Sequence, residues 1–197
     1  MNNSINFMLV GVGGQGTILA SDILAEVGLR LGYDVKKAEV HGMSQRGGSV
    51  ISNLRWGREV FSPIIPKGEV DILIAFEKLE AARYAESLRA GGTALVNDYR
   101  ITPVTVNAGS SIYPPDEVIR DLLSRVAGRQ VWVKGVEIAE SLGNVRTANV
   151  VLLGALSALL QMAPEPWFET IQSRVPPKYL EVNRKAFTEG RMKIHQP

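Results

Sequence analysis

The sequence contains no cysteine and only two histidines among its 197 residues. A chain without cysteine forms no disulfide and offers no thiolate for zinc, for nucleophilic catalysis or for an iron–sulfur cluster. Clustered His, Asp and Glu ligands, close carboxylate pairs, a nucleophile elbow and a lysine-bearing phosphate loop are missing as well. We therefore predict no metal site and no catalytic residue on this chain.

A large excess of charge and long apolar runs are also lacking. The net charge is only +2, which argues against a polybasic nucleic-acid binder. The longest apolar stretch, Val150–Met162, is too short to span a membrane. The first residues resemble no signal peptide. We expect a soluble, cytoplasmic protein that binds neither nucleic acid nor a membrane.

The residues that are present suit one substantial globular domain, with 45% hydrophobic and 21% charged residues. The chain opens with a short apolar run, Ile5–Val10, which ends in glycines and is typical of a buried strand. A helical stripe over Thr17–Leu31 and a second strand, Asp34–His41, follow. This β-loop-α-β order predicts an α/β sheet.

The rest of the chain extends this pattern. A glycine turn at 57–58 predicts an antiparallel hairpin between Gly48–Trp56 and Glu59–Phe61. We predict one three-layer α/β/α domain over residues 1–197, with a Rossmann-like, mostly parallel mixed sheet, this antiparallel excursion and a helical C-terminus. Further strands are expected at Val70–Phe76, Thr93–Asn97, Val131–Lys134 and, more weakly because of Pro103, Thr102–Val106. Helices are expected at Glu77–Ala90, Pro115–Ala127, Val136–Leu142, Thr147–Met162, Trp167–Arg174 and Lys178–Glu189.

The first glycine loop, Gly11–Gly16, satisfies the G-x-G-x-x-G pattern between a strand and a helix. Glycines let the backbone approach a phosphate, and a helix N-terminus adds free N–H donors. Glu39 could then bind the ribose of NAD, so a stand-alone NAD(P)-dependent oxidoreductase is one hypothesis. A tight turn without a ligand is the alternative. The candidate ligand contacts are Gly11, Gly13, Gly14, Gln15 (which could point into a site), Gly16 and Thr17.

A second glycine loop, Gly42–Ser49, contains a single charge, Arg46. Backbone N–H groups beside one arginine suit a phosphate or a carboxylate. The alternative is a surface loop whose arginine pairs with a neighbouring acid. Two such loops on one small domain suggest a composite site. The candidate contacts here are Ser44, Arg46, Gly47 and Gly48.

A third polar segment, Gly143–Asn149, leads into the most hydrophobic helix of the chain. Thr147 is the expected N-cap. Helix capping does not explain why Asn144, Arg146 and Asn149 occur together, so they indicate a shared polar site or an interface. Asn149 is a candidate ligand contact.

Together these segments resemble the gamma-type domain of the 2-oxoacid:ferredoxin oxidoreductases, most closely the beta subunits of its indolepyruvate-oxidising members. The first glycine loop, Glu39–Gly48 and Asn144 with Asn149–Ala155 support the likeness, and Lys178–Asn183 and Ala186–Phe187 extend it over essentially the whole chain. The Gly-Met-Ser-Gln-Arg-Gly-Gly run is its specific part.

The resemblance implies an oxidoreductase subunit that is inactive alone. The family oxidises 2-oxoacids, here an aryl pyruvate such as indolepyruvate, to acyl-CoA and carbon dioxide and reduces ferredoxin. Thiamine diphosphate and iron–sulfur clusters would belong to a large partner subunit, and this chain would complete the coenzyme A side of the site without binding a cofactor alone. Ferredoxin would be a partner of the assembled complex and not of this chain alone. A pure assembly module remains a further alternative.

Overall fold

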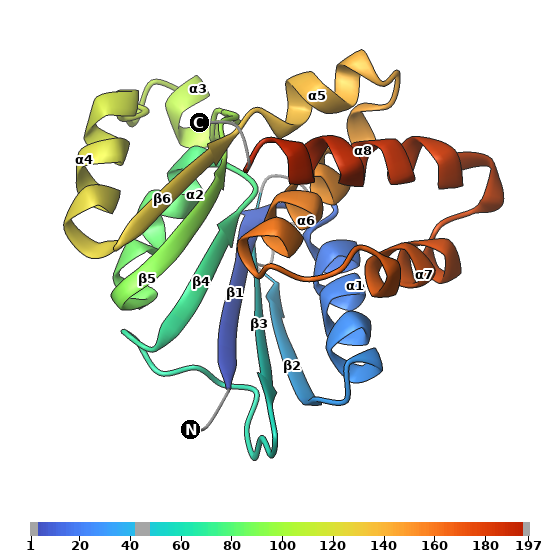
Figure 1. The fold of residues 1–197 in the computed structure, drawn as a ribbon. Helices are drawn as coiled ribbons and strands as arrows, with labels where there is room; N and C mark the ends of the chain where they lie inside the picture. The colour runs from blue at the N-terminus through green and yellow to red at the C-terminus, as the bar shows by residue number, and fades with distance from the viewer. Residues whose placement is uncertain (1–3, 42–47, 195–197) are drawn as a thin grey trace.

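The computed structural model describes residues 4–41 and 48–194, without the side chain of His41. A six-stranded sheet crosses the described chain in the order β2-β3-β1-β4-β5-β6 (Figure 1). Its strands are β1 (Ile5–Val12), β2 (Asp34–His41), β3 (Ser49–Gly57), β4 (Val70–Ala75), β5 (Leu88–Asn97) and β6 (Arg129–Val133).

One strand of this sheet runs against the others. β3 pairs antiparallel with both β1 and β2, whereas β1, β4, β5 and β6 pair in parallel. The predicted mixed, mostly parallel sheet is therefore confirmed. The predicted hairpin at Gly57-Arg58 is wrong, because β1 and β2 occupy both edges of β3 and leave Glu59–Phe61 no partner strand. The Val60 N–H bonds instead to the Asp34 carboxylate at 2.8 Å.

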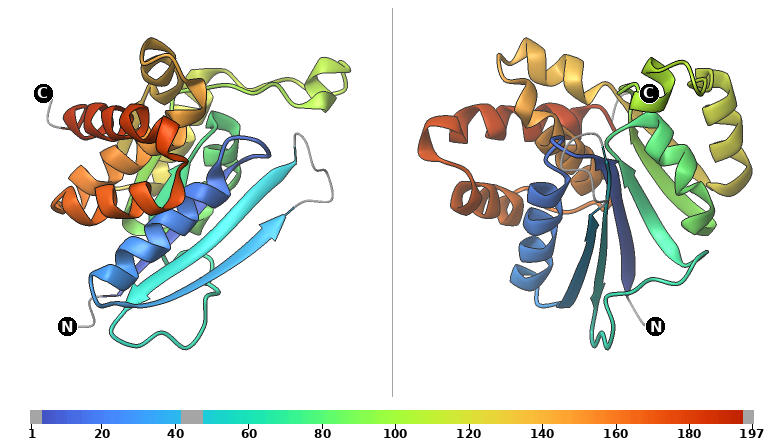
Figure 2. Two further views of the ribbon diagram at one scale, coloured as in Figure 1. Left: turned by 90° about the vertical axis from the view of Figure 1, so that its right-hand side faces the viewer. Right: turned by 180° about the vertical axis from the view of Figure 1, so that it is seen from behind.

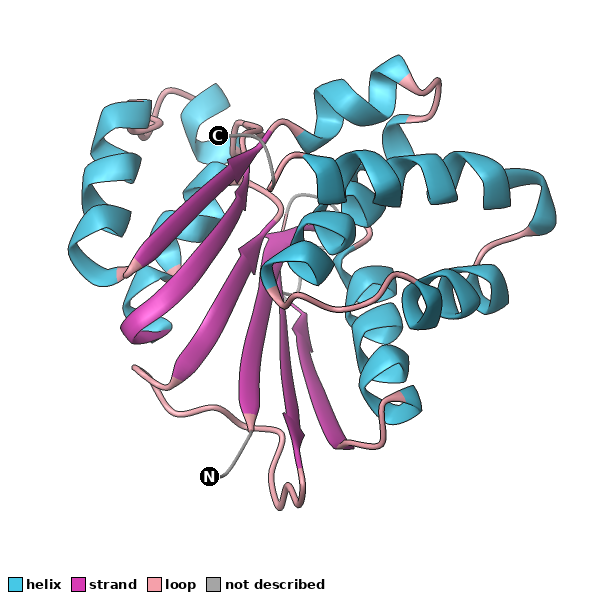
Figure 3. Cartoon of the chain, in the orientation of Figure 1, coloured by secondary structure: helices cyan, strands magenta, loops and turns pink. Residues whose placement is uncertain are grey.

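Helices cover both faces of the sheet, as Figures 2 and 3 show. In β1 the side chains alternate between two cores: Phe7 and Leu9 face one, Met8 and Val10 the other. The first core lies under α1 (Thr17–Arg30), α6 (Ala148–Leu159), α7 (Glu165–Arg174) and α8 (Leu180–Met192), and the second under α2 (Lys78–Arg83) and α4 (Asp116–Val126). The three-layer prediction is confirmed.

The central helix is α6, whose residues 149–158 are all buried, as its apolar sequence predicts. It crosses α8 at very close range through two glycines. A Cβ on Gly154 would lie 2.0 Å from the Phe187 carbonyl oxygen, and one on Gly190 would lie 1.9 Å from the Val151 oxygen. Only residues without a Cβ allow the two backbones to pack this closely.

Two further predicted elements differ from the structure. The helix expected over Glu77–Ala90 ends at Arg83, and after a 3-10 turn, η1 (Ala85–Ser87), strand β5 begins at Leu88. Pairing of Leu88 with Val70 in β4 overrides the local helical pattern. The strand expected at Thr102–Val106 is instead a short helix, α3 (Val104–Asn107), because the Pro103 carbonyl accepts the N–H groups of Val106 and Asn107.

The remaining elements complete the layer over the first core. They are α5 (Gly135–Ser141), η2 (Val145–Thr147) and η3 (Pro177–Tyr179). Over residues 4–41 and 48–194, no helix combines the length and apolar character needed to cross a membrane.

Candidate functional site

The first glycine loop meets Gly48, the described residue of the second loop before β3, at the carboxyl end of β1. The first loop leaves the carboxyl end of β1, where the antiparallel partner β3 begins. The Gly13 N–H donates to the Gly48 carbonyl oxygen at 3.0 Å. Of the predicted contacts in the second loop, Ser44, Arg46 and Gly47 lie outside the described residues, so the composite site is described here on the side of the first loop and Gly48.

Gln15 fixes the shape of the first loop. Its Oε1 accepts the Val12 N–H at 2.8 Å, and its Nε2 donates to the Phe76 carbonyl oxygen at 2.7 Å. Both ends of the amide are therefore engaged with the backbone. The side chain joins the end of β1 to the end of β4 and is not free to reach for a ligand.

Asn97, at the carboxyl end of β5, continues this network. Its Nδ2 donates to the same Phe76 oxygen at 3.1 Å, and its Oδ1 accepts the Gly135 N–H at 2.9 Å. The network thus ties the glycine loop to the start of α5. Asn97 was not among the predicted contacts, although ligands in α/β sheets bind at the carboxyl ends of the strands and Asn97 is a polar residue at such an end.

Gly16 and Asn149 bring two helix N-termini together. Gly16 precedes α1 in the left-handed region, with φ of 75°, and Asn149 Nδ2 donates to its carbonyl oxygen at 3.2 Å. A Cβ on Gly16 would lie 2.6 Å from that nitrogen. The third glycine of the motif therefore makes room for Asn149.

The other residues of the first loop differ in exposure. Gly14 is exposed, has φ of 98° and lines a cavity. Gly11 is buried, and a Cβ there would lie 2.7 Å from Thr17 Oγ1. The Thr17 hydroxyl is buried and has no hydrogen-bond partner among the described residues. Gly14 and Gly16 thus line the cavity, whereas Gly11 and Thr17 are buried residues outside its lining.

The sheet order argues against the NAD hypothesis. In a dinucleotide-binding fold the ribose acid ends the strand next to β1. Here β3 separates β2, and with it Glu39, from β1. Glu39 Oε1 accepts from Lys37 Nζ at 2.6 Å and from Ser21 Oγ at 3.3 Å. Glu39 therefore bonds to neighbouring side chains. It also lies one strand further from β1 than the dinucleotide fingerprint requires.

The third polar segment supplies the rest of the site. Thr147 stands at the N-cap of α6, but its hydroxyl donates back to the Asn144 carbonyl oxygen at 2.8 Å. Asn144 caps the preceding turn η2 by accepting the Arg146 N–H at 3.2 Å. Thr147 is therefore the N-cap residue of α6, as predicted, but its hydroxyl bonds to the turn η2 and does not cap the helix.

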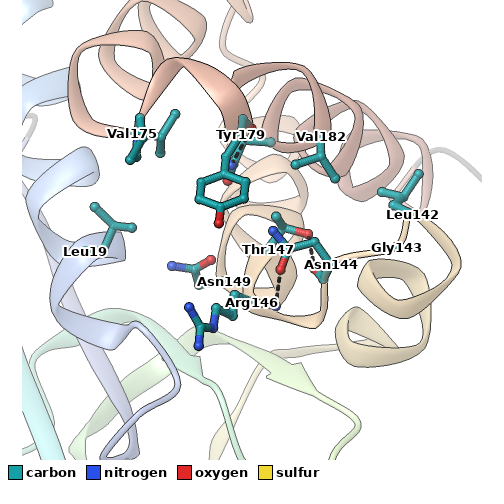
Figure 4. A pocket seen from close by; sticks show the side chains of 12 residues that line it. Leu19, Leu142, Gly143, Asn144, Arg146, Thr147, Asn149, Val175, Tyr179 and Val182 are labelled. Atoms are coloured by element: carbon teal, nitrogen blue, oxygen red, sulfur yellow. Dashed lines mark hydrogen bonds between the residues drawn. The ribbon is translucent and has the colours of Figure 1, made fainter.

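Two cavities adjoin Arg146 and Asn149. The larger, about 530 Å³, lies between the start of α6 and the segment that joins α7 to α8; the smaller, about 340 Å³, lies against the first glycine loop. Leu19, Arg146 and Asn149 line both. Figure 4 shows Arg146 and Asn149 on one side of the larger cavity and the Tyr179 ring facing them. Asn144, Arg146 and Asn149 all line the larger cavity, so the structure brings them together, and their binding role stays a prediction.

The electrostatics of this region favour an anion. Arg146 is exposed, and no carboxylate among the described residues pairs with its guanidinium. Neither α1 nor α6 has an acidic residue in its first turn, whereas α2, α4, α5, α7 and α8 each do. Residues from both starts, Gly16 and Ala148, line the smaller cavity. Two positive helix ends and an arginine therefore face one space.

Nearly all of the chain matches one protein family. Residues 6–192 fit the family described as "Pyruvate ferredoxin/flavodoxin oxidoreductase". The chain belongs to this family. It is 40% identical over 188 residues to "Indolepyruvate oxidoreductase subunit IorB" of Thermococcus kodakarensis, covering 94% of this chain and 93% of that protein. It is accordingly a subunit of a 2-oxoacid:ferredoxin oxidoreductase.

Solved structures of this oxidoreductase family share the fold. The gamma subunit of a keto/oxoacid ferredoxin oxidoreductase from Geobacter sulfurreducens superposes with a TM-score of 0.69 and 27% identity, over 97% of this chain and 98% of that chain. A second structure is a 2-oxoglutarate:ferredoxin oxidoreductase from Magnetococcus marinus, with 2-oxoglutarate, coenzyme A and succinyl-CoA bound. It superposes with a TM-score of 0.75 and 19% sequence identity. This fold spans 98% of the present chain but 31% of that longer one.

The chemistry of the site is that of binding. The helix N-termini offer backbone N–H donors and Arg146 offers a guanidinium, and both kinds of group suit an anion. Across the described residues, no group of three or more His, Asp or Glu side chains is placed to hold a metal.

Proposed function

We propose that this chain completes the coenzyme A side of an indolepyruvate:ferredoxin oxidoreductase. The complete enzyme would oxidise indolepyruvate, or another aryl pyruvate, with coenzyme A to the acyl-CoA and carbon dioxide. The electrons released would pass to ferredoxin. The name of the relative that is 40% identical supports the substrate, and the bound coenzyme A in the Magnetococcus marinus enzyme supports the second substrate.

The observation that supports this role most is the position of Arg146 between the two cavities. Coenzyme A presents phosphates, which suit a guanidinium and two helix N-termini. The larger cavity also has an apolar wall, formed by Leu19, Leu142, Val175 and Val182, that suits an uncharged part of the same molecule. The chain's own residues would bind and orient coenzyme A, with Arg146 on the phosphates.

The groups that perform the oxidation would belong to the larger subunit. Thiamine diphosphate would supply the decarboxylation chemistry and iron–sulfur clusters the electron path. The present chain has no cysteine with which to bind a cluster. We further propose that residues 1–197 form one gamma-type domain, that the pocket for the aryl group is shaped by the larger subunit, and that the complex works in the cytoplasm.

Co-expression with the larger subunit tests the reaction. The purified complex should reduce ferredoxin only when indolepyruvate and coenzyme A are both present, and the present chain alone should be inactive. A stable complex that shows no such activity with any aryl pyruvate would refute the proposed reaction.

An arginine substitution tests the site in that complex. Arg146→Ala should raise the KM for coenzyme A about tenfold or more, since a charge-assisted hydrogen bond contributes about 1.5–3 kcal/mol. The KM for indolepyruvate should stay within twofold. Arg58→Ala, an exposed arginine just after β3, is the matched control. An unchanged KM for coenzyme A, with weaker subunit association, would favour a pure assembly module.

A further inference from the structure

A projecting arm extends from the sheet edge that bears the candidate site. Residues 101–113 leave the body after β5, form α3 near the tip and return to the start of α4 (left view of Figure 2). The segment 101–115 contains no charged residue, although 21% of the chain is charged. None of the residues of α3 is buried. The segment therefore presents no charge that a partner would have to desolvate.

The two ends of the arm are fixed to one buried carboxylate. Glu77 Oε1 accepts the Ile101 N–H at 3.2 Å and the Tyr113 hydroxyl at 2.5 Å. Glu77 is 1% exposed, and its other oxygen caps α2. Burial and the bond to Glu77 raise the pKa of Tyr113, so its hydroxyl stays a donor at any working pH. The Arg100 guanidinium lies 4.1 Å from the Tyr113 ring centre.

The tip of the arm is ordered by its own hydrogen bonds. The Thr105 carbonyl oxygen accepts the N–H of Ser110 at 2.9 Å and that of Ser111 at 3.2 Å. The Ser111 hydroxyl donates to Thr105 Oγ1 at 3.0 Å, and the Ala108 N–H bonds to the Val104 oxygen at 2.8 Å. These bonds fix the shape of the tip before a partner binds, which lowers the entropic cost of docking.

Two aliphatic side chains of the arm face solvent. Val104 is 76% exposed and Ile112 is 91% exposed. The centre of a protein–protein interface is depleted of charged residues, as this arm is. A preformed base, a preformed tip and an uncharged surface with two exposed aliphatic side chains are together the properties of a docking element.

We propose that the arm docks into an apolar, uncharged recess on the larger subunit of the same oxidoreductase. The arm starts at the candidate site, since Tyr99 lines the smaller cavity and Ile101 begins the arm. Any polypeptide that closes this edge of the sheet therefore meets the arm. The same fold forms 31% of the longer Magnetococcus marinus chain, and in the proposed complex the larger subunit would supply the remainder. The identity of that polypeptide rests on the proposed function.

The test compares association of the full chain with the larger subunit. The double variant Val104→Ser/Ile112→Ser should weaken the Kd of the complex about tenfold or more, as expected when two interface anchors are truncated. Phe61→Ser is the matched control, because Phe61 is 87% exposed in the loop at the opposite end of the sheet. It should leave the Kd within twofold. Both variants should keep the wild-type Tm, since the altered side chains are exposed.

The outcomes separate this proposal from the proposed coenzyme A site. At concentrations that saturate the complex, the arm variant should keep the wild-type KM for coenzyme A, which Arg146→Ala is expected to raise. A Kd unchanged by the arm variant would overturn the docking proposal and leave the coenzyme A site untouched. Sedimentation of the isolated chain tests whether the arm instead contacts a second copy of this chain. A dimer that dissociates in the arm variant, together with an unchanged Kd for the larger subunit, would assign the arm to that dimer.

Discussion

The amide of Asn149 lies against Gly16, 133 positions earlier in the chain. Its Nδ2 is 3.2 Å from the Gly16 carbonyl oxygen, in a space that any Cβ on Gly16 would enter. This contact sets the start of α1 against the start of α6 and places Arg146 beside the first glycine loop. The candidate site therefore depends on an interaction between the first and third polar segments.

Substitution of Gly16 should disturb both stability and binding. Gly16→Ala must place a Cβ 2.6 Å from Asn149 Nδ2 and adopt a positive φ. We expect a loss of about 2–4 kcal/mol in the free energy of unfolding, measured in urea. Gly14→Ala is the control, because its φ is also positive but nothing lies within 4 Å of its Cβ. Gly14→Ala should lower the free energy of unfolding by only about 1–2 kcal/mol. Equal losses in the two variants would show that the Asn149 contact contributes nothing.

Loss of the Gln15 amide should loosen the glycine loop. Gln15→Ala removes the bonds to Val12 and Phe76, and we expect a loss of about 1–3 kcal/mol in urea unfolding. Affinity for coenzyme A in the complex should fall as well. Gln172→Ala, at an exposed position of α7, should stay within about 0.5 kcal/mol of wild type. A Gln15→Ala variant as stable as Gln172→Ala would contradict the role of this side chain.

The crossing of α6 and α8 should not tolerate a methyl group. Helix propensity alone predicts that Gly154→Ala stabilises the chain by about 1 kcal/mol. The 2.0 Å approach to the Phe187 oxygen reverses this expectation, and we predict a destabilisation of about 3 kcal/mol or more, measured by chemical unfolding. A Gly154→Ala protein with a raised Tm would refute the close crossing.

The contact between α1 and α7 should depend on pH. Burial by itself would raise the pKa of the Glu26 carboxyl, but hydrogen bonds from Arg174 and Arg30 outweigh it and lower the pKa below its ordinary value. A lowered pKa in the folded state means that the carboxylate stabilises the fold above its unfolded pKa of about 4.3. This contribution is lost as the pH falls through the folded value.

Glu26→Gln should therefore destabilise the chain by about 0.5–1 kcal/mol at pH 7, as for a partly exposed ion pair. The difference from wild type should shrink below about pH 4.3. Glu169→Gln, whose carboxylate is 66% exposed, should show a smaller difference at every pH. A deficit of Glu26→Gln that grows on acidification would contradict this sign.

Periodicity and turn residues were sufficient for most of the fold. The apolar run Ile5–Val10, the stripe over Thr17–Leu31 and the uniformly apolar Thr147–Met162 each predicted an element that the structure contains. The same local signals failed at Leu88–Gly92 and at Glu59–Phe61. At both places, whether a strand forms depends on whether a neighbouring strand has a free side with which to pair. A local sequence pattern does not specify which strands become neighbours.

The sequence by itself determined the residue types of the site: two glycine loops, one polar segment and no thiolate. Only the tertiary structure decided their roles. Insertion of β3 between β2 and β1 moved Glu39 away from the glycine loop, and packing of α6 against α1 placed Asn149 on Gly16. The physical reason is that both depend on contacts between segments far apart in the chain, which form when the buried faces of the sheet and helices come together.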